Sequence, residues 1–288
     1  MKGGLLFSYR HFSTYHFINQ ISQDALIHFL FCSIEDYMAI ETKPAELKVD
    51  PVIEEMMRAG LHFGHKTSKT HPNMKPYISG MRNTVHIIDM KFTQQKLDEA
   101  LAFLRKCREE NKIILMVGTR ISLRGIVKET ALAVGCPFVA ERWIGGTLTN
   151  FDMTQKRLDE LKELGIARER GDWQKYTKKE QAELLNRMES LEEKFGGIKQ
   201  LTGAPAVVFV CDLDENEIAV REAKKLGVPV VAIVDTNNDP KSVDYPIPAN
   251  NDASSSVQYI LSKVQHVLSE ARLPVLEHSD GGQAKPAV

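Results

Sequence analysis

Short runs of almost unbroken apolar residues recur along the chain from residue 113 onward. They are IILMV at 113–117, PFVA at 137–140, AVVFV at 206–210 and VVAIV at 230–234. Amphipathic helical patterns alternate with these runs, over about 93–110, from 120 to about 134, over 215–226 and over 253–271. Continuous apolar strands separated by helices are typical of a parallel sheet that helices cover on both faces. The pattern therefore predicts an α/β, Rossmann-like body.

A short helix and two short strands are predicted ahead of this body. Asp50 is a good N-cap for a helix that begins at Pro51, and Gly60 supplies a left-handed stop, so we expect a helix over 51–59. The stretches 77–81 and 84–88 read as strands on either side of Arg82 and Asn83. The helix thus leads directly into a segment that is rich in turns.

The α/β pattern is interrupted between residues 150 and 199, which is too long for an ordinary connection. Two charged helices are predicted there, over 151–164 and 178–195, and Thr177 with Glu180 forms a capping box for the second. Apolar residues at 184, 188, 191 and 195 follow the spacing of a coiled-coil seam. We expect an antiparallel helical hairpin, a coiled-coil arm whose charges are by default an exposed helix surface.

The ends of the chain differ from this core. Residues 1–37 hold eight aromatic residues without a sustained period, and their best apolar run is too short to span a bilayer. They fit neither a secretory signal nor a transit segment. We expect residues 1–49 to be an extension outside the fold, with 1–37 an over-long start as one reading, and 273–288 to be a disordered tail. Between them lie two body parts, 50–149 and 200–272, and the arm at 150–199.

Composition limits the classes of function. The chain has 37 basic and 38 acidic residues, so any contact with nucleic acid is confined to one face. Its four cysteines are far apart and form no Cys-x-x-Cys pair, which disfavours disulfides and a cysteine zinc site and fits a reducing cytoplasm. Cys136 and Cys211 lie beside apolar strands and are expected in the core.

The segment 61–89 concentrates positive charge within this balanced chain. Residues 65–91, which overlap this segment and extend just past its end, carry five Lys or Arg residues and three histidines against the single acid Asp89. Such a local field attracts phosphate groups. A solvated loop that leads into a hairpin is the alternative reading of the same charges.

Many α/β proteins are enzymes, and their active sites lie in the loops at the carboxyl ends of the strands. Those loops are therefore where catalytic or nucleotide-binding residues would be expected. The loop at 118–122, GTRIS, lacks the glycines and the Lys-Ser or Lys-Thr of a phosphate-binding loop. Asp212 and Asp235 follow neighbouring strands and could hold magnesium for phosphoryl transfer or nucleotide binding. Helix capping and turn formation explain these acids more simply. His62 and His65 are half of a possible zinc site, without a third ligand nearby, so no metal or cofactor is predicted.

Several long motifs resemble the universal S-two family of small-subunit ribosomal proteins. They are GLHFGHKTSKTHPNMKPYISGMRNTVHIID from residue 60, VGTR from 117, ERWIGGTLTNF from 141, GGIKQLTGAPAVVFVCD from 196 and AIVDTNNDP from 232, and the resemblance covers about 52–271. It implies a non-catalytic structural protein, bound to the ribosome in the cytoplasm, that contacts ribosomal RNA. The implied protein partners are neighbouring small-subunit proteins, including the large first protein that captures messenger RNA. Membranes and small-molecule substrates are not implied. The helical hairpin is similar to the arm of bacterial-type members.

The resemblance also implies which residues face RNA. Lys and Arg would contact phosphates, and His, Asn and Trp would bond to or stack on unpaired bases. For Trp143 a place in the core is an equal alternative. Two departures from the family pattern are Ile121 after Arg120, where Arg124 could supply the second charge, and Glu141 before Arg142. The implied RNA-facing residues are His62, His65, Lys66, Lys75, Arg82, Asn83, His86, Arg120, Arg142, Trp143 and Asn150.

Overall fold

The computed structural model describes residues 50–271, which belong to one compact unit. The predicted extension at 1–49 and the predicted tail at 273–288 lie outside the described residues. The division of the chain into an extension, two body parts, an arm and a tail therefore stays a prediction. None of the described helices is long and apolar enough to cross a bilayer.

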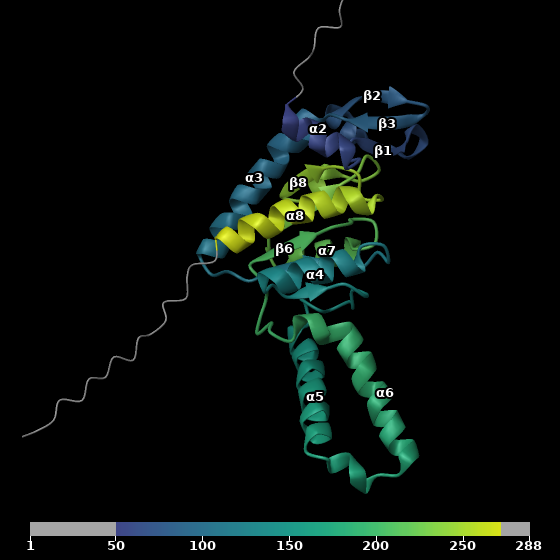
Figure 1. Cartoon of the computed structure of the whole chain (residues 1–288), viewed down its shortest axis with the longest axis vertical. Coiled ribbons are helices and arrows are strands. Elements are labelled where there is room, and N and C mark those ends of the chain that lie inside the picture. Colours follow the sequence, from purple (N-terminus) through teal and green to yellow (C-terminus); the bar gives the residue numbers. More distant parts are fainter. Residues whose placement is uncertain (1–49, 272–288) are drawn as a thin grey trace, which may run out of the picture. The chain divides into compact units, whose positions relative to one another are not determined.

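A five-stranded sheet forms the centre of the body (Figure 1). Its strands run in the order β5-β4-β6-β7-β8, and every neighbouring pair is parallel. The predicted α/β, Rossmann-like class is confirmed. The chain reverses its direction of winding between β4 and β6, which is the place where open α/β sheets form a crevice at the carboxyl ends of their strands. The strands are β4 (Ile114–Val117), β5 (Phe138–Val139), β6 (Val207–Val210), β7 (Val230–Val234) and β8 (Tyr245–Pro248).

Side chains of the central strands alternate between two separate cores, one on each face of the sheet. Ile114 and Met116 point to the face that α3 (Met90–Glu109), α4 (Arg124–Val134) and α8 (Ser254–Glu270) cover. Leu115 and Val117 point to the face that α7 (Glu217–Lys225) covers. Because strands buried on both faces need apolar residues at every position, they form continuous apolar runs in the sequence.

A small antiparallel sheet with the order β1-β3-β2 follows α2 (Pro51–Arg58). The Asp50 side chain accepts a hydrogen bond from the Val52 N–H, and Gly60 adopts a φ of +82°, so the predicted helix and both its ends are confirmed. The strands are β1 (Phe63–Lys66), β2 (Ile78–Arg82) and β3 (Val85–Ile88), and the 3-10 turns η3 (Thr67–Lys69) and η4 (Pro72–Tyr77) join β1 to β2.

The turn of this hairpin lies one residue later than the sequence predicted. Arg82 pairs with Val85, and the two residues between them, Asn83 and Thr84, have φ angles of +50° and +65°. Positive φ at both central positions is the geometry that matches the twist of the flanking strands. The prediction placed Arg82 in the turn, because asparagine alone marked it and a threonine in this conformation is uncommon.

The predicted helical hairpin is present as α5 (Phe151–Glu169) and α6 (Lys178–Phe195), with the 3-10 turn η5 (Asp172–Lys175) between them. The capping box of Thr177 and Glu180 is present in both of its hydrogen bonds. At the base of the hairpin, Leu158, Leu161 and Phe195 enter the core beside α7. Coiled-coil packing along the two helices stays a prediction.

Two strands and several helix limits differ from the predictions. Neither β1 nor β8 was expected, since β1 contains a glycine and β8 contains two prolines. Both strands lie at sheet edges, where such residues are tolerated. Helix α3 begins at Met90 because Asp89 caps it, and α5 continues through Gly165. Helix α4 begins at Arg124 and not at residue 120, and α7 begins at Glu217 and not at residue 215. The 3-10 turns η6 (Gly196–Ile198) and η7 (Pro240–Ser242) complete the described elements.

Candidate nucleic-acid interface

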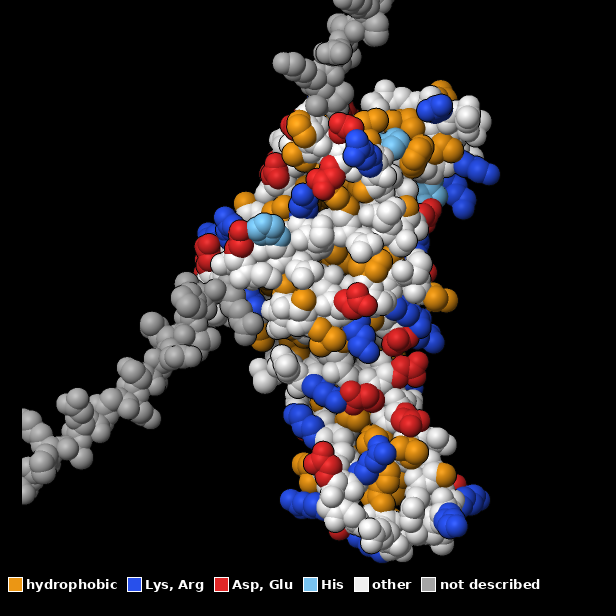
Figure 2. All heavy atoms as spheres, in the orientation of Figure 1, with side chains coloured by type: hydrophobic (Ala, Val, Ile, Leu, Met, Phe, Trp, Pro, Cys, Tyr) orange, Lys and Arg blue, Asp and Glu red, His pale blue; other side chains and the backbone are white. Residues whose placement is uncertain are grey.

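Exposed cations gather on the small sheet of β1 to β3. Lys66 ends β1, Lys75 lies in η4 and Arg82 ends β2, and all three side chains are exposed. Within residues 50–271, these three cations form no ion pair with an acid. Figure 2 shows Lys and Arg side chains grouped over this region. Beside them, Asn83 is exposed in the turn, so its amide is open to a partner.

The histidines of this segment are half-buried and contact the protein itself. The Nε2 atom of His86 lies 2.6 Å from the Thr70 hydroxyl oxygen, and the carbonyl of His62 accepts a hydrogen bond from the Ile88 N–H at 2.9 Å. Burial lowers the pKa of His62. The His86 side chain therefore ties β3 to the residue that follows η3, and the backbone of His62 bonds to the end of β3.

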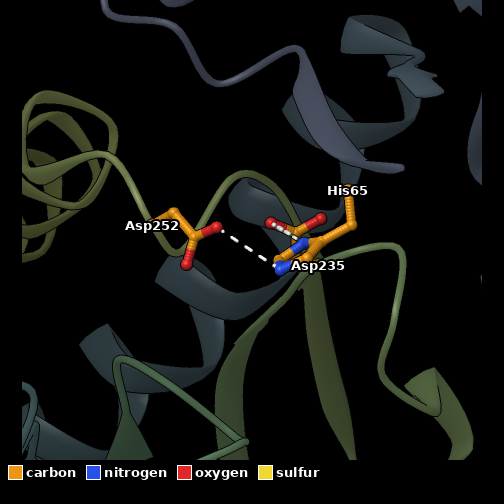
Figure 3. Close-up of side chains that lie close together, drawn as sticks. All are labelled: His65, Asp235 and Asp252. Atoms are coloured by element: carbon orange, nitrogen blue, oxygen red, sulfur yellow. Dashed lines mark ion pairs between the residues drawn. The ribbon is translucent and has the colours of Figure 1, made fainter. Parts of the chain in front are cut away.

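His65 joins the small sheet to the central sheet. Its ring lies between two carboxylates (Figure 3), with Nδ1 3.2 Å from Asp235 Oδ2 and Nε2 3.3 Å from Asp252 Oδ2. The contact with Asp235 raises the pKa of His65, and partial burial opposes this effect. The backbone N–H of His65 also donates to the Thr236 hydroxyl at 2.8 Å. A Cβ at Gly64 would lie 2.5 Å from Thr236, so only glycine allows this close approach.

Among the described residues, His65, Asp235 and Asp252 form a group that could hold a metal ion. One ligand atom each from His65, Asp235 and Asp252 lies within 4.8 Å of the others. A nitrogen and two carboxylate oxygens suit a divalent transition metal. The sequence had paired His65 with His62, but His62 does not belong to this group.

Arg120 occupies the crevice between β4 and β6. Its Nε lies 2.8 Å from Oδ2 of the buried Asp212, and its Nη1 contacts Asp252. Asn251 donates to the other Asp212 oxygen at 3.0 Å. Burial raises the pKa of Asp212 to about 6, and the Arg120 charge opposes that rise. The protein's own side chains thus fill the position where α/β enzymes bind nucleotides.

The magnesium hypothesis finds little support in these contacts. Asp212 pairs with Arg120, Asp235 contacts His65 and Thr236, and Asp239 caps η7 and accepts from Asn73 at 2.8 Å. Carboxylates that already have such partners act as structural anchors for loops. The capping and turn alternative is therefore the better account of these acids.

The loop of residues 141–150 is held by Glu222, a residue that sequence reasoning missed. The buried carboxylate accepts from the indole N–H of Trp143 at 3.1 Å and from the N–H groups of Gly146, Leu148 and Thr149 at 2.7, 3.0 and 3.1 Å. Burial alone would raise the pKa of Glu222, but these donors hold it below its ordinary value. The sequence feature that could have revealed Glu222 is its helical spacing: it falls on the same buried stripe of α7 as Ala219 and Ala223.

The predicted RNA-facing residues of this loop separate into two kinds. Arg142 and Asn150 are exposed, whereas Trp143 is only 7% exposed and its indole N–H is bonded to Glu222. This burial supports the alternative in which Trp143 closes the core. Arg124 pairs with Glu141 and donates to the Thr119 carbonyl, so the charge that could replace the one missing at Ile121 is bound to the other departure, Glu141.

Comparison with known proteins identifies the family. The family model described as ribosomal protein S2 matches residues 56–271. Small ribosomal subunit protein uS2 of Coprothermobacter proteolyticus is 42% identical over 220 residues, which are 76% of this chain and 82% of that protein. The uS2 proteins of Psychrobacter sp. and Dehalococcoides mccartyi are 40% and 43% identical, over 82% and 81% of this chain and 90% and 96% of their own lengths. The chain therefore belongs to the ribosomal protein S2 family, of bacterial type, and is a structural, non-enzymatic protein of the small ribosomal subunit.

Proposed function

We propose that this protein binds small-subunit ribosomal RNA through the exposed cations on and beside the β1 to β3 sheet. Lys66, Lys75 and Arg82 carry the contact, because they are exposed and no described acid neutralises them. A cation without an internal partner keeps its full charge for a phosphate, and each such contact releases counterions from the RNA. Asn83 in the hairpin turn, and Arg142 and Asn150 in the 141–150 loop, are exposed and would add further contacts to the RNA.

The remaining predicted residues contact other parts of the protein itself. The side chains of His65 and His86 and the backbone of His62 hold the small sheet in place, and Arg120 and Trp143 contact buried acids. Such positioning groups keep the exposed cations in a fixed arrangement, which limits the entropy that binding costs. We infer that these five residues act mainly through the exposed ones.

The partners and the place of action are further parts of this proposal. The near-zero net charge of the chain suits a protein with one RNA face and other faces toward protein neighbours. The resemblance to bacterial-type members supports a cytoplasmic, ribosome-bound protein that contacts neighbouring small-subunit proteins, among them the large messenger-capturing first protein. The rival magnesium-dependent phosphoryl-transfer or nucleotide-binding enzyme has no observation in its favour.

The test is co-sedimentation of the variant Lys66→Glu/Lys75→Glu/Arg82→Glu with small subunits. A matched control, Lys128→Glu/Lys224→Glu/Lys225→Glu, makes the same change of charge at exposed positions on α4 and α7. We expect the first variant to lose association by more than about tenfold at moderate salt, since it loses several phosphate contacts, and the control to associate normally. Normal association of the first variant would refute the assigned surface.

A further inference from the structure

The hairpin tip, defined as residues 168–179, is a second concentration of positive charge. It contains two acids, Glu169 and Asp172, and the local net charge is therefore +3 (5 − 2), in a chain whose net charge is −1. Figure 2 shows Lys and Arg side chains around the connection between α5 and α6. The five cations of the tip are Arg168, Arg170, Lys175, Lys178 and Lys179, and all are exposed.

The tip cations differ from those along the hairpin in having no acidic partner within the described residues. Arg157 and Arg187 both pair with Glu160, at the middle of the two helices. Lys162 lies 3.7 Å from Asp159, and Lys199 lies near Glu192 just beyond the base of the hairpin. Most of the cations named along the hairpin therefore form ion pairs within the protein, whereas the five cations of the tip form none among the described residues and are free to bind a ligand.

Two of the tip cations lie at helix positions where a positive charge lowers the stability of the helix. Lys178 and Lys179 are the first two residues of α6, at the positive end of the helix dipole, where an acid would be favourable. The Thr177 and Glu180 capping box satisfies only the N–H groups of Thr177 and Glu180. The first-turn N–H groups of Lys178 and Lys179 have no partner within the helix and add to the field that attracts an anion. Folding alone does not explain this placement.

Aromatic rings lie among these cations. The guanidinium of Arg168 is 6.0 Å from the ring centroid of Trp173, and the Lys175 ammonium is 5.4 Å from that of Tyr176. Tyr176 is 42% exposed. Exposed rings beside cations are the combination with which proteins bind unpaired nucleotides, since the ring stacks on a base and the cation contacts a phosphate.

We propose that the hairpin tip is a second RNA-binding surface, which holds an unpaired segment of ribosomal RNA. Phosphates contact Arg170, Lys178 and Lys179, and a base stacks on Tyr176. Protein interfaces are depleted in lysine at their centres, so the unpaired lysines favour RNA over an acidic protein. This inference rests on the proposed RNA binding of the whole protein and adds a site to it.

The test measures binding of the full-length protein to deproteinised small-subunit RNA at several salt concentrations. The tip variant is Arg170→Glu/Lys178→Glu/Lys179→Glu, and its matched control on the same hairpin is Lys156→Glu/Lys162→Glu/Lys194→Glu. We expect the tip variant to lose at least about tenfold in affinity and two to three units of the salt slope, and the control to bind like wild type. Glutamates at 178 and 179 favour the N-terminus of α6, and a glutamate at 170 disfavours the C-terminus of α5, so the effects offset and the tip variant should stay close to the wild-type thermal stability.

Two further variants separate stacking from charge. Tyr176→Ala should lower the affinity and leave the salt slope unchanged, and Tyr176→Phe should bind like wild type, since a phenyl ring also stacks. Wild-type affinity and slope for the tip variant would overturn the proposal. So would a tip variant that binds RNA normally but fails to join subunits assembled with their proteins, which would indicate a protein partner.

A parallel measurement on Lys66→Glu/Lys75→Glu/Arg82→Glu separates the two proposals. If this variant loses RNA binding and the tip variant does not, the tip proposal fails and the proposed function stands. If wild-type protein shows no salt-dependent binding to the RNA, both proposals fail.

Discussion

The indole N–H of Trp143 donates to the carboxylate of Glu222 at 3.1 Å, so the aromatic residue of the 141–150 loop is anchored to helix α7. The same carboxylate accepts from three backbone N–H groups of that loop. One buried acid thus sets the conformation of a loop that presents Arg142 and Asn150 to solvent. The loop's proposed contact with RNA depends on a residue that does not itself face RNA.

Removal of this anchor should destabilise the protein. Glu222→Ala leaves the Trp143 indole and the three N–H groups without an acceptor, and buried unpaired donors are costly. We expect the free energy of unfolding to fall by about 3 kcal/mol, measured by urea denaturation. Glu217→Ala, which removes an exposed acid of the same helix, is the control and should change stability little. Equal stability of the two variants would contradict the anchoring role.

The same acid should contribute to the pH dependence of stability. The pKa of Glu222 is lower in the folded protein than its ordinary value of 4.5, so the folded state binds fewer protons at this group. Its stabilisation is present above that ordinary value and is lost as the pH falls through the folded-state pKa. We expect Glu222→Gln to reduce the dependence of unfolding free energy on pH in the acid range. Unchanged pH dependence in urea titrations would count against this.

Arg120 should prove to be a structural residue. Arg120→Ala leaves the buried Asp212 carboxylate without its cation, which typically costs about 3 to 5 kcal/mol. The double variant Arg120→Ala/Asp212→Asn removes the uncompensated charge and should recover a large part of that loss. Unfolding measurements on the two variants and wild type give the comparison. A double variant that is less stable than the single one would show that the ion pair is not the cause.

The connection from the hairpin to the sheet should not tolerate a side chain at Gly197. An added Cβ would lie 2.2 Å from the Phe138 carbonyl oxygen of β5, so the backbone must shift. We expect Gly197→Ala to lower the free energy of unfolding by about 1 to 3 kcal/mol. Gly165→Ala is the control, because a Cβ there meets no atom within 4 Å and alanine favours the helix. Thermal unfolding of both variants should show opposite shifts.

The sequence predicts elements that are long or strongly patterned and fails on short ones at edges. The apolar runs of β4, β6 and β7 are buried on both faces, so each carries the signal in full. Strand β8, YPIP, pairs with only one neighbour, and that leaves prolines permissible and the pattern weak. Helix α5 was predicted to end before Gly165, because a lone glycine resembles a stop although it is tolerated inside a helix.

The candidate site shows the same limit in another form. The sequence shows where positively charged residues cluster, and the structure shows that Lys66, Lys75 and Arg82 of that cluster are exposed. The sequence does not show which positively charged side chains form ion pairs with acids far away in the chain, as Arg120 does with Asp212. Such pairs depend on how the strands assemble, which no local pattern records.

The most direct test of the account is site-specific photo-crosslinking in assembled small subunits. A photoreactive amino acid replaces Arg82 in one protein and Arg221 in another; Arg221 is exposed, and it pairs with Glu217 on α7. The account predicts crosslinks to ribosomal RNA from position 82 and few or none from position 221. RNA crosslinks from position 221 with none from position 82 would contradict the proposed RNA-binding surface.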